Sequence, residues 1–143
     1  MLRRFATVLT ATATLSAVAA PALACPPPAG GEQSTGGDRL TISYRSDERA
    51  AEHSFTLRCN PAGGSHPDVR AACDAVTDAT RGLRDPWEPV SADTACTQVY
   101  GGPQTARITG VWKGRPVDAS FNRANGCEIA RWDTLTPALP AAG

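Results

Sequence analysis

The chain has 143 residues, and its 14 lysine and arginine residues balance 14 aspartate and glutamate residues to a formal net charge of zero. This length suits a single domain, with a core that covalent cross-links would help to stabilise. The neutral balance argues against nucleic-acid binding, which needs a basic stripe, and Lys113 is the only lysine in the chain.

The N-terminal residues 1 to 24 have the pattern of a signal peptide. Arg3 and Arg4 precede an uncharged apolar run from 5 to 20, and Ala22-Leu23-Ala24 matches the small-x-small cleavage pattern. A membrane helix is the alternative, but the run is shorter than the roughly 20 strongly apolar residues that a span needs. We therefore expect a secreted, extracellular protein whose mature chain is slightly acidic.

Cys25 directly follows the expected cleavage point, and a lipid on its thiol would anchor the protein in the cell envelope. Such sites usually have a Leu-like residue three places before the cysteine and a small residue next, whereas Ala22 and Leu23 stand in the reverse order here. A free or intermolecularly paired thiol is the alternative. Residues 25 to 38 are rich in Pro and Gly, and we expect them to form a spacer.

Two strands are expected at the start of the domain, at residues 40 to 44 and 53 to 59, because apolar and polar residues alternate in both. The polar link between them favours an antiparallel pair. After a turn-rich segment, apolar residues at a spacing of three and four from Asp68 to Ala79 predict an amphipathic helix that ends near Gly82.

Two further strands are predicted at residues 104 to 112 and 117 to 121, with residues 113 to 116 as a hairpin connection. Together the elements predict an α+β fold, a two-layer sandwich in which one main α-helix covers an antiparallel β-sheet. We expect this domain to occupy residues 39 to 133. Residues 134 to 143 are expected to form a C-terminal tail.

The five cysteines indicate disulfides, because the chain is expected to be exported. The four cysteines from Cys59 onward allow three pairings, which the sequence alone does not separate. No CxxC pair occurs, and His53 and His66 lie at no spacing that would complete a zinc site with two cysteines. We therefore expect no metal and no cofactor.

The segment from 94 to 103, around Cys96, is the most informative part of the chain. It lies between an acidic loop interrupted by prolines and a predicted strand, so we expect an exposed loop that is held to the body at Cys96. Protease inhibitors present an extended, exposed peptide of this kind to their target protease.

Several segments, with four cysteines in register, carry a resemblance to a known family. They are LT (40–41), TLRCNP (56–61), GSHP (64–67), AC (72–73), TRG (80–82), Cys96 with VY (99–100), GVWKGR (110–115) and NGCE (125–128). Over residues 40 to 129 the chain resembles the Streptomyces subtilisin inhibitor family. The members of this family are secreted inhibitors of subtilisin-like serine proteases. The resemblance implies an extracellular subtilisin-like serine protease as the partner and a homodimer formed through the sheet.

The resemblance also implies two disulfides, Cys59–Cys73 and Cys96–Cys127, and leaves Cys25 outside this framework. By the chain-entropy model the first would contribute roughly 3 kcal/mol and the second roughly 3 to 4 kcal/mol to the free energy of unfolding. The second would also clamp the inhibitory segment to the body of the domain.

The family's scissile bond lies two residues after the loop cysteine, which here implies Gln98–Val99 as the reactive bond and Gln98 as the P1 residue. Asn125 is implied to brace the loop by hydrogen bonding, although Asn125-Gly126 is also compatible with a simple turn. The rest of the implied reactive loop consists of Ala95, Cys96, Thr97 and Tyr100.

Two positions, Gln98 and Thr97, depart from the family pattern. Gln98 replaces a large apolar P1 residue, and a polar, uncharged P1 argues against a trypsin-like target, whose S1 pocket holds an Asp. Thr97 replaces a frequent proline, which should loosen the loop slightly, and Gly101-Gly102 is expected to add freedom on the primed side. A degenerate surface turn in an inhibitor-like fold is the alternative to an active loop.

Two other classes of function compete with inhibition. One is a non-inhibitory envelope lipoprotein or binding module with the same fold, which lipidation of Cys25 would favour. The other is a small hydrolase that uses Ser65 and His66, but neighbours in sequence rarely have triad geometry, and no Gly-x-Ser-x-Gly elbow is present. We therefore expect no catalytic residues and no enzyme activity.

Overall fold

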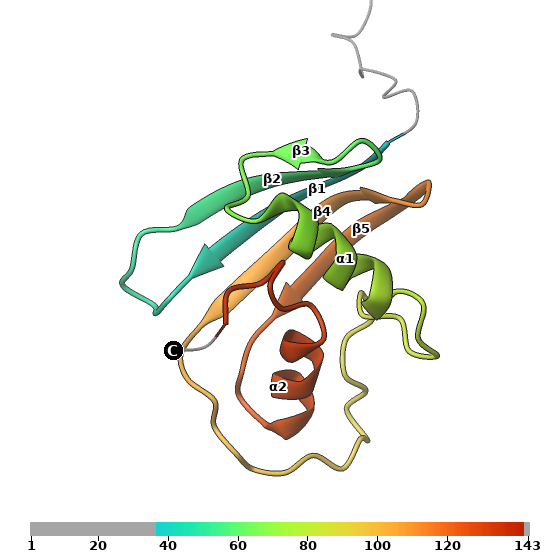
Figure 1. Cartoon of the computed structure of the whole chain (residues 1–143). Coiled ribbons are helices and arrows are strands. Elements are labelled where there is room, and N and C mark those ends of the chain that lie inside the picture. Colours follow the sequence, from blue (N-terminus) through green and yellow to red (C-terminus); the bar gives the residue numbers. More distant parts are fainter. Residues whose placement is uncertain (1–36, 142–143) are drawn as a thin grey trace, which may run out of the picture. The chain divides into compact units, whose positions relative to one another are not determined.

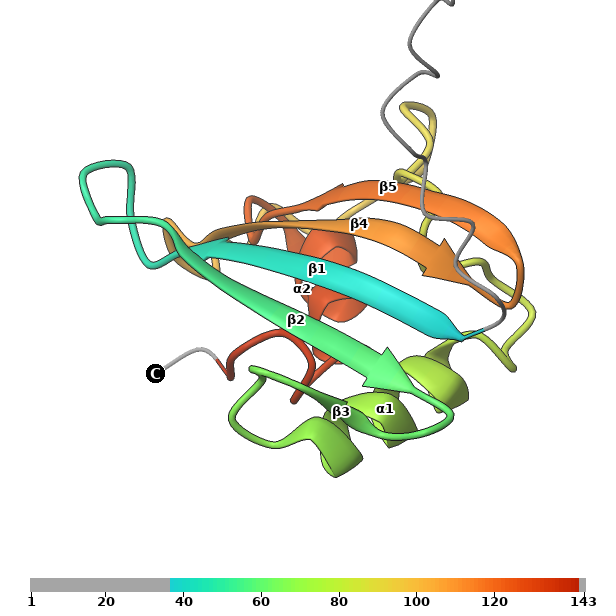
Figure 2. The ribbon, with the colours of Figure 1, turned by 90° about the horizontal axis from the view of Figure 1, so that it is seen from above.

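The computed structural model describes residues 37–141, in which two helices lie on one face of an antiparallel sheet (Figure 1, Figure 2). The sheet has five strands in the order β3-β2-β1-β4-β5. In chain order the elements are β1 (Asp38–Arg45), β2 (His53–Cys59), β3 (Gly63–Gly64), α1 (Val69–Ala79), β4 (Thr105–Trp112), β5 (Arg115–Phe121) and α2 (Gly126–Asp133). The expected α+β fold is confirmed, with a second helix in addition.

The expected signal peptide, residues 1 to 24, and Cys25 lie outside the described residues. The spacer was expected to end at residue 38, but Asp38 begins β1 and pairs with Cys59 of β2. Among residues 37–141, no helix has both the length and the apolar character needed to cross a membrane.

The four long strands form two antiparallel pairs, β1–β2 and β4–β5, which are joined by the pairing of β1 with β4. β1 pairs with β2 from Asp38 opposite Cys59 to Tyr44 opposite His53, as the polar link between them indicated. β4 and β5 form a hairpin in which Lys113 and Gly114 both have positive φ, of 49° and 75°. Positive φ at both central residues is typical of the tight turns that match the twist of paired strands.

The core lies between the sheet and the helices, because alternate strand residues point to that face. Their largest fully buried members are Leu40, Ile42, Leu57, Ile108 and Phe121. Helix α1 adds Ala72, Cys73 and Val76 from one side, as its three-four spacing predicted. The disulfide Cys59–Cys73, with Cα atoms 5.8 Å apart, links the end of β2 to this helix.

The C-terminal segment is part of the core and not a tail. Leu135, Ala138 and Leu139 are each 0% exposed, next to the fully buried Trp132 of α2. Burial of one leucine side chain contributes about 1.5 to 3 kcal/mol, which explains why the segment packs against the domain despite its prolines. The domain boundary expected at residue 133 is therefore wrong, and the fold continues to about residue 140.

This packing predicts that Leu139→Ala lowers the free energy of unfolding by about 2 to 5 kcal/mol, because it removes buried methyl groups and leaves a cavity. Leu83→Ala is the matched control, since Leu83 is fully exposed and its loss should change stability by less than about 0.5 kcal/mol. Urea unfolding of both variants measures the difference. Equal midpoints would contradict the place of Leu139 in the core.

Candidate functional site

The candidate site is the long connection between α1 and β4, which contains no helix or strand from residue 80 to 104. It curves around α2 before it rejoins the sheet as β4 (Figure 1). Its middle part projects its side chains into solvent. Gln98 is exposed, and Val99 and Tyr100 have 57% and 67% of their surfaces exposed. These two adjacent side chains are therefore available to a binding partner.

Two attachments hold the loop on the N-terminal side of Gln98. The disulfide Cys96–Cys127, with Cα atoms 5.4 Å apart, joins it to the first turn of α2. The N–H group of Gly126 then donates a hydrogen bond of 2.9 Å to the carbonyl oxygen of Thr97. A Cβ atom on Gly126 would clash with Oγ1 of Thr97, so a larger residue at this position would force the Thr97 side chain to move.

A third attachment holds the loop on the C-terminal side of Val99. The N–H group of Gly101 donates to the carbonyl oxygen of Arg123 at 2.8 Å, and Nε of Arg123 donates to the carbonyl oxygen of Gly101 at 3.1 Å. The expectation that Gly101-Gly102 loosens this side is therefore wrong for Gly101. Gly102 has a φ of 121°, a backbone conformation that favours glycine, so it serves the turn into β4.

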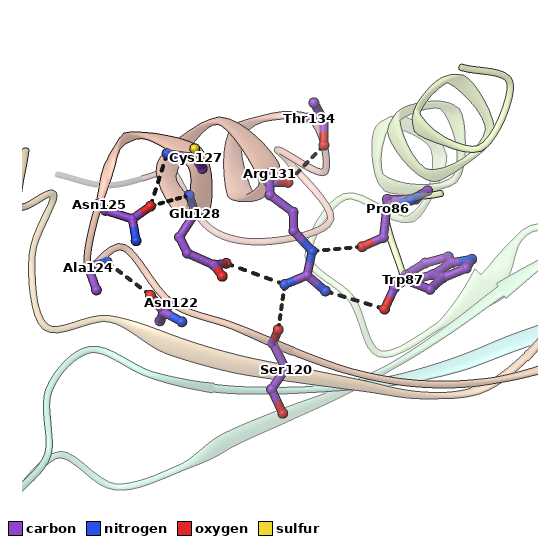
Figure 3. A network of polar contacts seen from close by, with 10 residues as sticks. All are labelled: Pro86, Trp87, Ser120, Asn122, Ala124, Asn125, Cys127, Glu128, Arg131 and Thr134. Carbon is purple, nitrogen blue, oxygen red and sulfur yellow. Dashed lines mark hydrogen bonds and ion pairs between the residues drawn. The ribbon is translucent and has the colours of Figure 1, made fainter. Parts of the chain in front are cut away.

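Helix α2 carries the two attachments on the N-terminal side of Gln98 and is itself fixed to its surroundings (Figure 3). The Arg131 guanidinium donates to the carbonyl oxygens of Pro86 at 3.0 Å, Ser120 at 2.8 Å and Trp87 at 3.4 Å. It also pairs with Glu128 at 3.4 Å and lies 4.2 Å from the centre of the Phe121 ring. One side chain thus connects α2 to β5 and to the loop that begins the connection.

The side chain of Asn125, which the resemblance implies to brace the loop, forms hydrogen bonds at the start of α2. Its side-chain oxygen accepts hydrogen bonds from the N–H groups of Cys127 and Glu128, both at 3.0 Å, so Asn125 is the N-cap of α2 (Figure 3). The cap fixes the helix start that holds Gly126 and Cys127, and therefore supports the loop indirectly.

The structure brings the implied loop residues together as one exposed strip. Ala95, Thr97, Gln98, Val99 and Tyr100 are all exposed, while the bonded Cys96 is half-buried. The sequence analysis missed α2, Arg123 and Arg131. A helix cap at Asn125 followed by Glu128 was a signal for α2, whereas nothing local to Arg123 indicates its contact with Gly101.

Three titratable groups have shifted pKa values, one ahead of the site and two on the sheet. A hydrogen bond from the Ser91 hydroxyl lowers the pKa of the Asp93 carboxyl, ahead of the exposed strip. Arg107 and Asp118 lie on the open face of the sheet, which is the face away from the helices. The hydrogen bond from Arg107 lowers the pKa of Asp118, and the same bond raises the pKa of Arg107. None of the three groups has a hydrogen-bond partner among residues 97 to 100. What the strip offers is therefore a peptide backbone and its side chains, without an acid–base pair.

Ser65 and His66 do not form a catalytic pair in the described part of the chain. The Ser65 hydroxyl oxygen accepts a hydrogen bond of 2.9 Å from the backbone N–H of Thr56. The His66 ring is bound through Nε2 to the carbonyl oxygen of Ala138 at 3.2 Å, and its Nδ1 accepts from the N–H of Asp68. Both side chains are used in holding the turn before α1.

Comparison with known proteins gives the family. Residues 37–125 match the family described as subtilisin inhibitor-like. Subtilisin inhibitor-like protein 1 of Streptomyces cacaoi is 34% identical over 87 residues, which are 60% of this chain and 78% of that protein. Subtilisin inhibitor of Streptomyces violaceus is 32% identical over 122 residues, which are 83% of this chain and 82% of that protein.

Among solved structures, sermetstatin of Streptomyces caespitosus in complex with Bacillus licheniformis subtilisin is 23% identical, with a TM-score of 0.47, and the match covers 74% of this chain and 100% of that chain. The family match over residues 37–125 spans more than half of the sequence. The chain therefore belongs to the subtilisin inhibitor-like family, a family of protease inhibitors and not of enzymes.

Proposed function

We propose that the protein inhibits extracellular subtilisin-like serine proteases by presenting Gln98–Val99 as a substrate-like peptide bond. The observation that carries this proposal is the exposure of Gln98, Val99 and Tyr100 between attachments on both sides, at Cys96 and Gly101. An exposed peptide can add as a strand to the edge of a protease cleft, where main-chain hydrogen bonds give affinity and side chains give selectivity.

Rigidity explains why such a loop would inhibit and not merely be consumed. Because the ends of the strip are already bound to α2 and to Arg123, little conformational entropy is lost when the protease binds it. If the protease cleaves the bond, both new ends stay near each other and the bond can form again. A slowly released complex is the expected result.

Gln98 is the proposed P1 residue, and its uncharged amide fits a broad S1 pocket better than one lined by an Asp. We therefore propose a subtilisin-type target in preference to a trypsin-type target. One relative, from Streptomyces violaceus, is named as a subtilisin inhibitor, which is the same class of target.

We further propose that the protein is exported. The N-terminal pattern up to Ala24 and the two disulfides within residues 37–141 support an oxidising location. Lipidation of Cys25 would place the same inhibitor on the cell envelope without changing the loop.

The inhibitor is also proposed to be a homodimer through the open face of the sheet, where Val111 is 42% exposed beside polar strand residues.

This arrangement predicts that Val111→Asp shifts a dimer towards monomer, because it places a charge in the interface. Light scattering measures the mass of both proteins in solution. A wild-type protein that is monomeric at micromolar concentration would contradict this arrangement.

The assignment of Gln98 to P1 predicts that Gln98→Leu tightens binding to subtilisin by roughly 1 to 2 kcal/mol, about tenfold, because it adds apolar surface to the S1 contact. Gln98→Lys is expected to create inhibition of trypsin, since it supplies a cation to the pocket's Asp. Inhibition constants against both proteases measure these effects. Ala92→Lys adds the same charge to the same loop as a control. Unchanged profiles for both Gln98 variants would show that this residue does not fill S1.

The disulfide at the loop predicts a second difference. Replacement of both Cys96 and Cys127 by Ala should convert the inhibitor towards a substrate that is cut between Gln98 and Val99, because the loop loses its covalent attachment. Replacement of Cys59 and Cys73 by Ala is the matched control, since it removes the other disulfide and leaves the loop attached.

Both double variants are compared at a temperature at which circular dichroism shows each to be folded. Mass spectrometry after incubation with subtilisin then gives the site and rate of cleavage. Equal persistence of inhibition in the two double variants would contradict the role of the loop disulfide.

A further inference from the structure

Arg123 is the only polar or charged residue that is buried within residues 37–141, with 8% of its surface exposed. It lies in the short connection between β5 and α2. Burial of an ionised guanidinium costs free energy unless the group is paired and hydrogen-bonded. The groups that bind Arg123 therefore indicate the structural role of this buried side chain.

These partners connect the reactive loop to α2. Nε donates to the carbonyl oxygen of Gly101 at 3.1 Å, and Nη1 donates to Oδ1 of Asp133 at 2.9 Å. The guanidinium carbon lies 5.7 Å from the centre of the buried Trp132 ring, within the range of a cation–π contact. The backbone carbonyl of Arg123 also accepts the N–H of Gly101. Arg123 therefore binds the peptide groups on both sides of Gly101.

We propose that Arg123 is a positioning residue that holds the primed side of the reactive bond in place, an inference that rests on the proposed function. On the other side of the bond, the disulfide Cys96–Cys127 provides a covalent attachment. The hydrogen bonds of the described residues connect residues 99 to 104 to the body only at Gly101. Arg123 is thus the non-covalent counterpart of the disulfide.

The chemistry of the reactive bond explains why this attachment matters. Hydrolysis adds one water across Gln98–Val99 and leaves a carboxyl group on Gln98 and an amino group on Val99. Resealing forms the amide bond again and releases that water. Its equilibrium depends on the effective concentration of the amino group beside the carboxyl group. Arg123 fixes the chain two residues after Val99, so it keeps the amino group within reach.

Gly101 is shaped for this contact. A Cβ atom on Gly101 would lie 2.8 Å from the Ile129 side chain of α2 and 3.1 Å from Nε of Arg123. Gly101 is not among the glycines of positive φ, so its backbone conformation would accept alanine. Glycine is therefore favoured at this position because a side chain has too little room there, and not because the backbone needs a conformation that only glycine adopts.

Arg123→Met tests the proposal, because methionine keeps an unbranched apolar side chain and removes both guanidinium hydrogen bonds. Its partner Asp133 is 58% exposed, so the carboxylate left behind stays in water and the variant should fold. Arg81→Met is the matched control, since it removes the arginine of the exposed Arg81–Asp78 pair beside the C-terminal end of α1, away from the face proposed for dimerisation. Each purified protein is incubated with catalytic subtilisin, and the ratio of cleaved to intact inhibitor at equilibrium is measured by mass spectrometry.

We expect Arg123→Met to raise this ratio by about tenfold, and to make inhibition decay with time, while Arg81→Met behaves as the wild type. Hydrogen exchange of the free proteins supplies a readout that does not depend on inhibition. The peptide that contains Gly101 should exchange faster in Arg123→Met only. An unchanged ratio and unchanged exchange in folded Arg123→Met would overturn the proposal. Faster exchange in a protein that never inhibits subtilisin would instead refute the proposed function and leave the attachment in place.

A second pair of variants covers the case in which Arg123→Met does not fold. Gly101→Ala should also raise the ratio of cleaved to intact inhibitor, because its methyl group displaces the loop from Arg123. Adding Ile129→Ala should bring the ratio back towards the wild-type value, since it makes room for that methyl group. A wild-type ratio in Gly101→Ala, or no recovery in the double variant, would contradict the geometry.

Discussion

The disulfide between Cys96 and Cys127 joins the exposed loop to the first turn of α2, and the other features of the site depend on this attachment. A connection that runs without helix or strand from residue 80 to 104 would otherwise sample many conformations. Once Cys96 is fixed, the carbonyl of Thr97 meets the N–H of Gly126. The backbone is then held up to the residue before Gln98.

The helix that receives the loop is short and would be unstable alone. It is held by three kinds of contact: the Asn125 cap at its start, the burial of Trp132 in the core, and the hydrogen bonds of Arg131 to β5 and to the residues that follow α1. The core therefore stabilises α2, and α2 in turn stabilises the conformation of the loop. The buried Leu139 belongs to this support, because it packs in the same core as Trp132.

The parts that could be predicted from the sequence are those with a local signal. Alternation indicated β1 and β2, the turn-forming residues 113 to 116 indicated the β4–β5 hairpin, and the three-four spacing up to Ala79 indicated α1. The disulfide pairing came from family resemblance, because spacing alone left three pairings open. Helix α2 was missed because its eight residues carry too little periodicity. The burial of Leu139 and the contact of Arg123 with Gly101 depend on the tertiary structure, so no local pattern reveals them.

A crystal structure of the protein bound to subtilisin is the most direct test of the central claim, that the fixed loop is bound as a substrate would be. The account predicts that the Gln98 side chain occupies the S1 pocket. It also predicts that the loop backbone moves by less than about 1 Å from its free conformation, because it is already ordered. Another surface of the domain in the protease cleft, or a rearranged loop that has lost its contacts with Gly126 and Arg123, would contradict it.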